Sequence, residues 1–442
     1  MRCSTRILCA LWLLCQPLAA LGLDARADIT KAVELIEAQQ FSLARTYLGP
    51  ALISPALNQG ERSRAYYLRG YTYVAENLPV SARKDFTRAL EFNPANPAAL
   101  VELGRLHLAG RGIEKDPQLA FTLFQQAADL GYSAGHFHIG YAYLLGEGVD
   151  KNLLKAREIL TKAAEDGHVF AMLSLASSYR QDHVARPEPE LAAQWYEKAH
   201  EAGSDKALLS LGYMYANGEF GEPDHGTAVK LFERAADAGV ESARVSLAYA
   251  YLTGRGVEQD NERAFELYLT AARAGETASY VGLGHMYEAG IGTVADPEIA
   301  RSWYEKAARL GNMEGQQRLI SWFLGKTGAE ARRQAIYWGR QAALSGDAKA
   351  MNDYAWLLAT SKFDKMRNGT LALDQAEKAV AKNASPAYLD TLAAAYAEIG
   401  NFEQAVTVQL QALDALDADT EGLRRELEER LAQYRRSQPW RE

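Results

Sequence analysis

Cysteine is nearly absent from this 442-residue sequence, and the three that occur, Cys3, Cys9 and Cys15, all lie near the N-terminus. Removal of that segment would leave a chain without a thiol. Such a chain has no disulfide bond, no thiolate nucleophile and no thiolate metal ligand. We therefore expect packing alone to hold the fold together.

Proline is also scarce, with 13 residues, and no stretch alternates apolar and polar side chains over a length that would form a β-strand. Basic runs are missing as well. The net charge is −8, and Lys and Arg do not cluster, which argues against nucleic-acid binding. These absences are typical of a soluble, acidic, helical protein.

Catalytic motifs are absent too: there is no G-x-S-x-G, no H-E-x-x-H and no phosphate-binding glycine loop after a strand. His136 and His138 look like a metal pair. Side chains two residues apart on a helix, however, point about 200° apart and cannot share one ion. We expect no enzyme activity, no catalytic residue, no cofactor and no metal.

The N-terminus carries the features of an export signal. Two arginines precede an uncharged apolar stretch at residues 7–21, and small residues suited to cleavage follow at 20–22 and 25–27. The apolar stretch is about 15 residues long, short of the roughly 20 that span a bilayer. The sequence predicts a signal peptide over residues 1–27 and no membrane-spanning segment after its removal.

Lipidation is not expected, because Cys9 and Cys15 each follow a leucine, whereas a lipoprotein signal has a small residue before its cysteine. The predicted location is therefore periplasmic or secreted.

A fixed interval of 36 residues organises the middle of the chain. Glycine recurs at this interval, and so does tyrosine, in phase with it. The two sets are Gly131, Gly167, Gly203, Gly239, Gly275 and Gly311, and Tyr143, Tyr179, Tyr215, Tyr251 and Tyr287. A period of this length predicts a solenoid, in which stacked units present an extended binding surface.

Each unit reads as two helices. In the unit at 242–275, Gly254 ends the first helix and either Asp260 or Asn261 caps the second. Small residues on both helices allow a close approach. They are Gly104, Gly140, Ala176, Gly212, Ala248 and Gly284 on the first helices, and Ala120, Ala156, Ala192, Ala228, Ala264 and Ala300 on the second.

The bulky partners expected on the second helices are Phe124, Leu160, Tyr196, Phe232, Tyr268 and Tyr304. The tyrosine set that includes Tyr143 and Tyr287 is also expected to pack in the core. The third unit lacks the glycine loop at 181–184, and a seventh unit, at 314–346, is shorter.

The motif L-G-x-x-Y-x-x-G-x-G, followed by D, A, Y, K-A-A and G at residues 283–311, resembles the Sel1-like repeat, a longer relative of the tetratricopeptide repeat. The flanking units resemble tetratricopeptide repeats proper. The resemblance implies an all-α fold, a right-handed α-solenoid (superhelix) of about ten helix-turn-helix repeats. We expect tetratricopeptide-like hairpins at 28–97, a Sel1-like array at 98–348, and tetratricopeptide-like repeats with a capping helix at 349–442.

The resemblance implies a protein–protein interaction scaffold or adaptor in a bacterial envelope. In such arrays, the residue after each small residue of a first helix points into the concave face. Here that position is held by Tyr71, Arg105, Tyr141, Ser177, Tyr213, Tyr249 and His285. We predict that this row binds a protein or peptide partner, because tyrosine combines an apolar face with a polar tip.

Alternatives remain open. The row of tyrosines also suits a polysaccharide, as in a scaffold of an exopolysaccharide secretion system, and the rings could instead pack between units. A secreted factor that engages a host is a further alternative. Some Sel1-like proteins are described as β-lactamases, but those are rich in paired cysteines, which this chain lacks outside its N-terminal segment.

Overall fold

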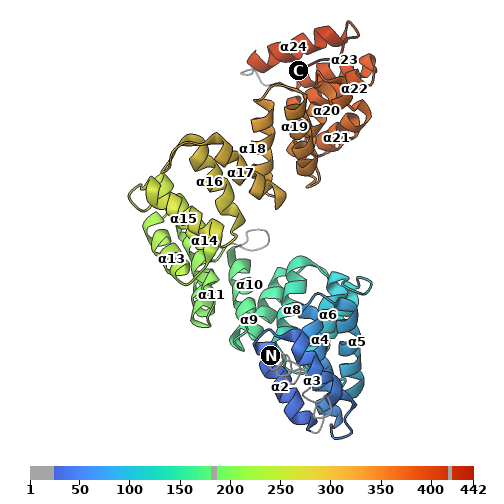
Figure 1. Ribbon diagram of the computed structural model, residues 1–442, viewed down its shortest axis with the longest axis vertical. Helices are drawn as coiled ribbons and strands as arrows, with labels where there is room; N and C mark the ends of the chain where they lie inside the picture. The colour runs from blue at the N-terminus through green and yellow to red at the C-terminus, as the bar shows by residue number, and fades with distance from the viewer. Residues whose placement is uncertain (1–23, 181–186, 417–420) are drawn as a thin grey trace, which may run out of the picture. The chain divides into compact units, whose positions relative to one another are not determined.

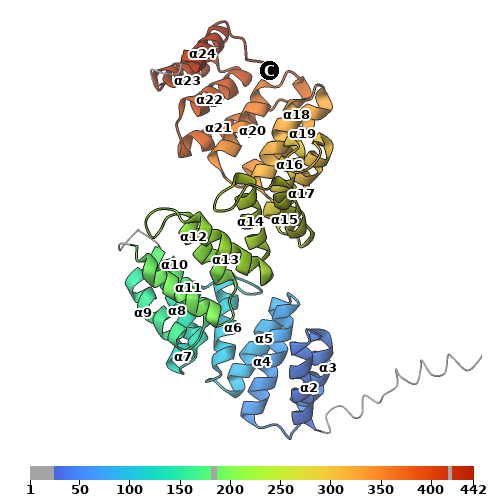
Figure 2. The ribbon, with the colours of Figure 1, turned by 90° about the vertical axis from the view of Figure 1, so that its left-hand side faces the viewer.

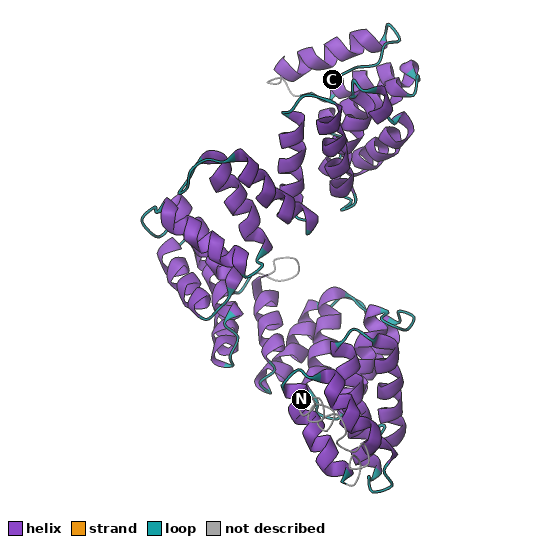
Figure 3. Ribbon diagram, in the orientation of Figure 1, coloured by secondary structure: helices purple, strands orange, loops and turns teal. Residues whose placement is uncertain are grey.

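The computed structural model describes residues 24–180, 187–416 and 421–442. Throughout these residues the chain forms α-helices joined by short loops, and none of them lies in a β-strand (Figure 3). The predicted all-α fold is confirmed. The chain divides into two units, residues 1–223 and 224–442, which are described separately below.

The described part of the first unit runs from the blue to the green helices of Figure 1. Its helices are α2 (Ala25–Glu37), α3 (Phe41–Ile53), α4 (Gln59–Ala75), α5 (Pro79–Phe92), α6 (Pro97–Ala109), α7 (Pro117–Asp129), α8 (Ser133–Leu145), α9 (Leu153–Glu165), α10 (Val169–Arg180), α11 (Pro189–Glu201) and α12 (Lys206–Ala216).

The second unit ends in the red helices of Figure 2. Its helices are α13 (His225–Asp237), α14 (Glu241–Thr253), α15 (Asn261–Arg273), α16 (Thr277–Ala289), α17 (Pro297–Arg309), α18 (Met313–Leu324), α19 (Ala329–Ala343), α20 (Ala348–Thr360), the short 3-10 helix η1 (Asp364–Met366), α21 (Gly369–Lys382), α22 (Pro386–Glu398), α23 (Phe402–Asp414) and α24 (Glu421–Tyr434).

Within each unit the helices pack in chain order. The first helix of a pair contacts its second helix, and the second helix contacts the next first helix. First helices of successive pairs also contact one another: α2 with α4, α6 with α8 and α8 with α10 in the first unit, and α14 with α16 and α20 with α22 in the second. The first helices therefore form the more closely packed layer of each unit.

The α14–α15 pair shows how the sequence builds a repeat. Gly254 ends α14 in the left-handed conformation, with φ 68°. Of the two cap candidates it is Asp260 that caps α15, by accepting a hydrogen bond from the Arg263 amide at 2.9 Å. The Asp260 amide in turn donates to the Tyr251 carbonyl at 3.0 Å and closes the loop.

Gly256, in the same loop, fixes how successive pairs meet. Its φ is 78°, and a Cβ atom at this position would lie 2.1 Å from the carbonyl oxygen of His225, at the start of α13. The loop therefore rests directly on the preceding second helix. Only glycine permits both this backbone conformation and this close approach.

The predicted small and bulky positions form the interior of the helix pairs. The small alanines of the second helices are at most 1% exposed, and their bulky partners at most 5%. Tyr143 is half-buried and meets Phe121 of the preceding second helix edge to face, with ring centroids 5.7 Å apart. Tyr287 meets Phe265 in the same way at 5.5 Å. This tyrosine set packs between successive pairs.

The ends add detail to the sequence-based expectation. Helix α2 begins at Ala25, so the cleavage candidate at 25–27 lies in its first turn, whereas the candidate at 20–22 lies outside the described residues. The glycine-free loop at 181–184 also lies outside them. The terminal helix α24 is not simply a solvated cap, because Arg430 is 8% exposed on its inner face.

In the described part of the chain, every helix is too short or too polar to cross a bilayer.

Candidate partner-binding surfaces

All seven residues predicted to form the binding row lie on first helices. Four of them are tyrosines with open rings: Tyr71 is 40% exposed, Tyr141 38%, Tyr213 41% and Tyr249 48%. These exposed tyrosines differ from the half-buried set that packs between pairs. Their rings are therefore open to solvent.

The other three members of the row differ in exposure. Arg105 on α6 is exposed, whereas Ser177 on α10 and His285 on α16 are partly buried. Tyr249 and His285 belong to the second unit and the remaining members to the first, so each unit carries its own part of the row.

Two members of the row come together at a hollow of about 250 Å³ between α6 and α8, which we call the Arg105 hollow. Arg105 and Tyr141 line it together with Glu102, Phe137 and His138. The Arg105 Nη1 donates to both carboxylate oxygens of Glu102, at 2.8 and 3.0 Å. This pair holds the guanidinium at the rim of the hollow.

Beside the hollow, four rings from α8, α10 and the loop between α9 and α10 form what we call the aromatic cluster: Phe137, Tyr141, His168 and Phe170. The Phe137 ring centroid lies 5.7 Å from that of Tyr141 and 6.3 Å from that of Phe170. It also stacks on the His168 ring at 4.7 Å. Phe170 is 66% exposed, which is unusual for a phenylalanine.

The imidazoles of this region are neutral at neutral pH. The His138 ring stacks on Phe124 with centroids 4.5 Å apart, and burial, helped by the nearby Arg105, lowers the pKa of His138 to about 3. Burial also lowers the pKa of His168, whose Nδ1 accepts a hydrogen bond from the Ala171 amide at 3.2 Å. The cations that line the Arg105 hollow are therefore Arg105 and Arg111.

The chemistry available here is recognition. The cluster offers flat apolar rings, one tyrosine hydroxyl and a neighbouring guanidinium, which are the side chains enriched at the centres of protein interfaces. Over the described residues, no three His, Cys, Asp or Glu side chains converge as a metal site would require.

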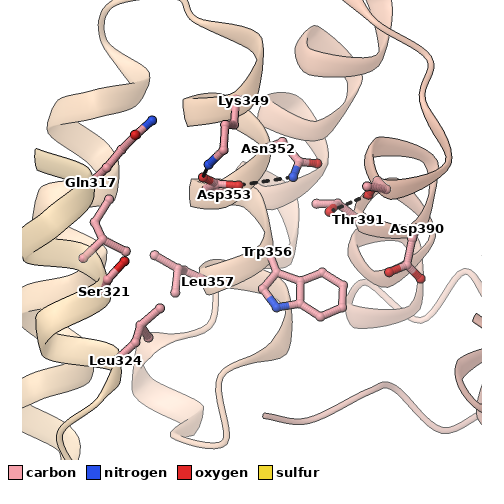
Figure 4. A pocket seen from close by; sticks show the side chains of 12 residues that line it. Gln317, Ser321, Leu324, Lys349, Asn352, Asp353, Trp356, Leu357, Asp390 and Thr391 are labelled. Carbon is pink, nitrogen blue, oxygen red and sulfur yellow. Dashed lines mark hydrogen bonds and ion pairs between the residues drawn. The ribbon is translucent and has the colours of Figure 1, made fainter. Parts of the chain in front are cut away.

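The second unit has a hollow of its own, about 350 Å³ in volume, between the first helices α18, α20 and α22 (Figure 4). We call it the Trp356 hollow. Gln317 and Ser321 of α18 lie on one side, Asp390 and Thr391 of α22 lie on the other, and the Trp356 indole of α20 lies between them (Figure 4). The lining residues used below are Gln317, Ser321, Lys349, Asn352, Asp353, Trp356 and Asp390.

One acceptor in the Trp356 hollow is unsatisfied. Asn352 is 8% exposed, and its side-chain oxygen is buried without a hydrogen-bond partner. Its amide nitrogen lies 3.5 Å from Asp353, which pairs with Lys349 at 2.5 Å. A buried oxygen of this kind costs free energy until a donor reaches it.

A buried ion pair lies at the edge of the same hollow. The Asp390 carboxylate accepts from Arg430 Nη1 at 2.8 Å and from Gln409 Nε2 at 2.7 Å. Burial raises the pKa of Asp390, and the charge of Arg430 opposes that rise. This pair anchors α24 against α22 and stiffens one wall of the hollow.

The predicted row of residues does not include the Trp356 hollow or most of the aromatic cluster. One signal was available: a further step of 36 residues from His285 leads to Ser321, which lines the hollow. Phe137 lies one helical turn before Tyr141, but the predicted row holds a single residue per unit and therefore does not include it.

Known proteins share the repeat of this chain. The family model described as "Sel1 repeat" matches residues 97–132, 133–168, 169–204, 205–240, 242–276, 277–312 and 323–347. No curated protein matches the sequence.

Solved structures of similar fold include a protective antigen of uropathogenic Escherichia coli strains that displays an SLR fold. It is 24% identical, with a TM-score of 0.48, over 95% of this chain and 92% of that one. A Sel1 repeat protein from Oxalobacter formigenes is 28% identical, with a TM-score of 0.47, over 55% of this chain and 96% of that one. Yeast Tom70 is 14% identical, with a TM-score of 0.37, over 93% of this chain and 95% of that one.

The matched repeats cover more than half of the sequence: six of them span the helices from α6 to α17, and the seventh spans α19. Chains of this kind typically serve as scaffolds for protein interactions. The chain belongs to the Sel1 repeat family.

Proposed function

We propose that this protein is an exported interaction scaffold of the bacterial envelope that binds a protein partner on its first-helix surfaces. The observation that carries the proposal is the aromatic cluster, where Phe170 and Tyr141 are 66% and 38% exposed. Aromatic side chains in this setting supply large contact area with little rotamer entropy to lose.

The cluster is held in place before any partner arrives. Phe137 contacts Tyr141, His168 and Phe170, so the rings support one another. Arg105 is fixed by Glu102 at the rim of the neighbouring hollow. A preformed surface loses less conformational entropy on binding, and more of the contact energy is available as affinity.

The test uses the full chain as bait in cross-linking of intact envelopes, followed by purification of the captured partner. A variant carrying Tyr141→Ala and Phe170→Ala should bind that partner at least about 30-fold more weakly, because truncation at an interface centre costs about 2 kcal/mol or more. Binding of purified proteins is measured by calorimetry.

The matched control carries Leu154→Ala and Tyr337→Ala. These two apolar side chains are 65% and 50% exposed, and they lie on the second helices α9 and α19. The control should bind like the wild type. If the two variants bind equally well, the aromatic cluster is not the docking surface.

A polysaccharide ligand remains the second candidate, since the exposed rings of Tyr71 and Tyr141 would also stack on sugar faces. Titration with envelope polysaccharides, followed by intrinsic fluorescence, separates it from the protein-binding proposal. A host-directed role predicts protein in the culture supernatant, whereas an envelope role predicts protein retained in the periplasmic fraction.

The proposed export leads to an expectation about the cleavage site. The Asp24 side chain caps α2 by accepting from the amides of Arg26 and Ala27, at 3.1 and 3.2 Å. Ala25 is 2% exposed, and Arg26 pairs with Glu61 at 2.6 Å. Cleavage after residue 22 keeps all of these contacts, whereas cleavage after residue 27 removes them.

We therefore expect the mature chain to begin at residue 23. Mass spectrometry of the N-terminal peptide from fractionated cells measures this directly. A chain that begins at residue 28, as the signal peptide predicted over residues 1–27 would leave it, would contradict this expectation, and an unprocessed chain in the cytoplasm would contradict export.

The Trp356 hollow extends the proposal to the second unit. The unpaired oxygen of Asn352 suits a backbone N–H of an extended peptide segment, and the Trp356 ring offers a flat wall beside it. Asn352→Ala should weaken the binding of a partner that also uses this unit by about fivefold, since a hydrogen bond of this kind contributes about 1 kcal/mol.

A further inference from the structure

A third hollow, about 330 Å³ in volume, lies in the second unit where α18 ends and α19 begins. We call it the Arg332 hollow. It is formed by the α18–α19 loop, the first turn of α19 and the loop after α20. Three cations line it, Lys326, Arg332 and Lys362, with one carboxylate side chain, that of Glu442.

The guanidinium of Arg332 has unused donors. Its Nε and Nη2 atoms are both buried and have no hydrogen-bond partner. Burial lowers the pKa of Arg332, and Glu442 opposes that effect only through its charge. An arginine stays protonated in proteins, so this edge of the guanidinium is a desolvated pair of N–H groups in need of two acceptor oxygens.

The carboxylates nearby are used elsewhere. Glu330, in the same turn of α19, pairs with Arg333 and accepts from Gln334. The Glu442 carboxylate accepts from the Trp356 indole N–H at 2.7 Å, and its main-chain oxygen accepts from the Lys362 amide at 3.1 Å. Arg332 is left without an acidic partner.

The two lysines have no carboxylate partner either. The Lys326 ammonium lies over the Trp322 ring at 4.5 Å, and the Lys362 ammonium over the Phe363 ring at 5.7 Å. Both lysines are exposed. Among the side chains that line the hollow, three are positive and one is negative.

We propose that the Arg332 hollow binds the phosphoryl group of a small phosphomonoester. The Nε and Nη2 atoms of Arg332 pair with two phosphoryl oxygens in the bidentate manner that guanidinium favours. Lys326 and Lys362 balance the charge. Gly328, the residue before α19, lines the hollow and provides no side-chain cap, so the first amides of α19 add donors at this end of the helix.

Two features select a phosphomonoester over other anions. A carboxylate carries one charge, and Arg332 alone would use both of its oxygens, so no oxygen would remain to contact the lysines. The volume also exceeds what phosphate alone needs, and Phe323 and Phe363 supply apolar walls. The ligand is therefore a dianion that carries a small apolar group.

Phenyl phosphate is the probe, titrated into the full chain and followed by calorimetry and ³¹P NMR. We expect it to bind at least tenfold more tightly than benzoate, which has the same ring with a carboxylate. The second phosphate pKa is about 6, so affinity should rise between pH 5 and 7.5 as the dianion forms. Benzoate binding should not change over that range.

Variants separate pairing geometry from charge. Arg332→Lys keeps the charge but loses the paired donors, and Arg332→Gln loses both, so each should weaken phenyl phosphate at least tenfold. The Lys326→Gln/Lys362→Gln double variant changes only exposed side chains and should also weaken it at least tenfold. Arg333→Gln, next in sequence and paired with Glu330, should leave binding unchanged.

Thermal melts check that each variant folds. If an Arg332 variant does not fold, the Lys326→Gln/Lys362→Gln variant provides the test. The proposal is overturned if phenyl phosphate fails to bind at 10 mM (about a hundredfold above a weak 0.1 mM site). Equal binding of benzoate, or equal binding by the wild type and the variants, also overturns it.

Discussion

Gly284 illustrates how a single position sets the distance between two helices. The ring of Tyr304, from the second helix of the same pair, occupies the space where a side chain would be, and an added Cβ atom would lie 2.4 Å from its Cε1 atom. The Tyr304 ring is 2% exposed, and its hydroxyl donates to Glu288 at 2.8 Å. Burial of the ring and the hydrogen bond of its hydroxyl therefore hold the ring in place.

We expect Gly284→Ala to lower the free energy of unfolding by about 1–3 kcal/mol, the usual cost of overpacking a core. Gly422, in the first turn of α24, is the control, because no atom lies within 4 Å of its added Cβ. Gly422→Ala should be neutral or slightly stabilising. Urea unfolding measures both, and equal effects would contradict the packing argument.

The protonation of His138 makes the stability of the folded chain depend on pH. Its pKa is lowered to about 3 in the folded chain, mainly by burial, whereas the unfolded value is about 6.5. Between these values the unfolded state binds more protons than the folded state. Stability therefore falls as the pH drops through this window, and it is fully retained above it.

We expect His138→Gln to make the loss of stability between pH 6 and pH 4 shallower by about 1 kcal/mol per pH unit. Urea unfolding midpoints of the wild type and the variant, measured across that range, test the expectation. Parallel pH profiles would show that the His138 imidazole is protonated in the folded chain.

At the scale of a helix, α24 shows how the end of the chain is held. Leu427 and Leu431 are buried against the preceding pair. Between them Arg430 pairs with Asp390 of α22, and its guanidinium lies 5.0 Å from the ring of Trp356. The helix is attached by apolar contacts and oriented by one buried ion pair.

Arg430→Ala should cost about 3 kcal/mol or more, because the Asp390 carboxylate would stay buried without its cation. Local undocking of α24 is the expected response, seen as faster hydrogen exchange in that helix. The control is Arg425→Ala, whose side chain is 83% exposed and pairs only with Glu429. That change should cost less than about 0.5 kcal/mol.

At the scale of the whole molecule, the chain is a series of local contacts. Within each unit, helices pack on the helices next to them in sequence, and several first helices also pack on the next first helix. The stability of such an array is close to a sum over pairs and their interfaces. A defect in one pair should therefore be felt by its neighbours and fade beyond them.

Hydrogen exchange of the Gly284→Ala protein tests this locality. Exchange should accelerate in α16 and α17 and, to a lesser degree, in α15 and α18, while amides of α4–α9 keep wild-type rates. The Gly422→Ala protein provides the baseline. Uniform acceleration along the chain would mean that the array unfolds as a single cooperative block.

The sequence by itself determined the helix pairs, because their signals are local and repeated. Gly254 ends α14, and Asp260 caps α15, as their residue types require. Small residues such as Ala248 and Ala264 are fully buried where the period placed them. The 36-residue spacing repeats these helix ends, caps and small residues in successive units, so a single irregular unit does not hide the pattern.

Only the tertiary structure decided which surfaces gather into sites. Phe170 contacts Phe137 across two successive pairs, and Arg332 and Lys362 line the same hollow, at distances in sequence that no period predicts. These groupings depend on how loops and neighbouring pairs pack. A repeat pattern fixes the position of each residue within its own unit, but the neighbours it gains from other units follow from three-dimensional contacts.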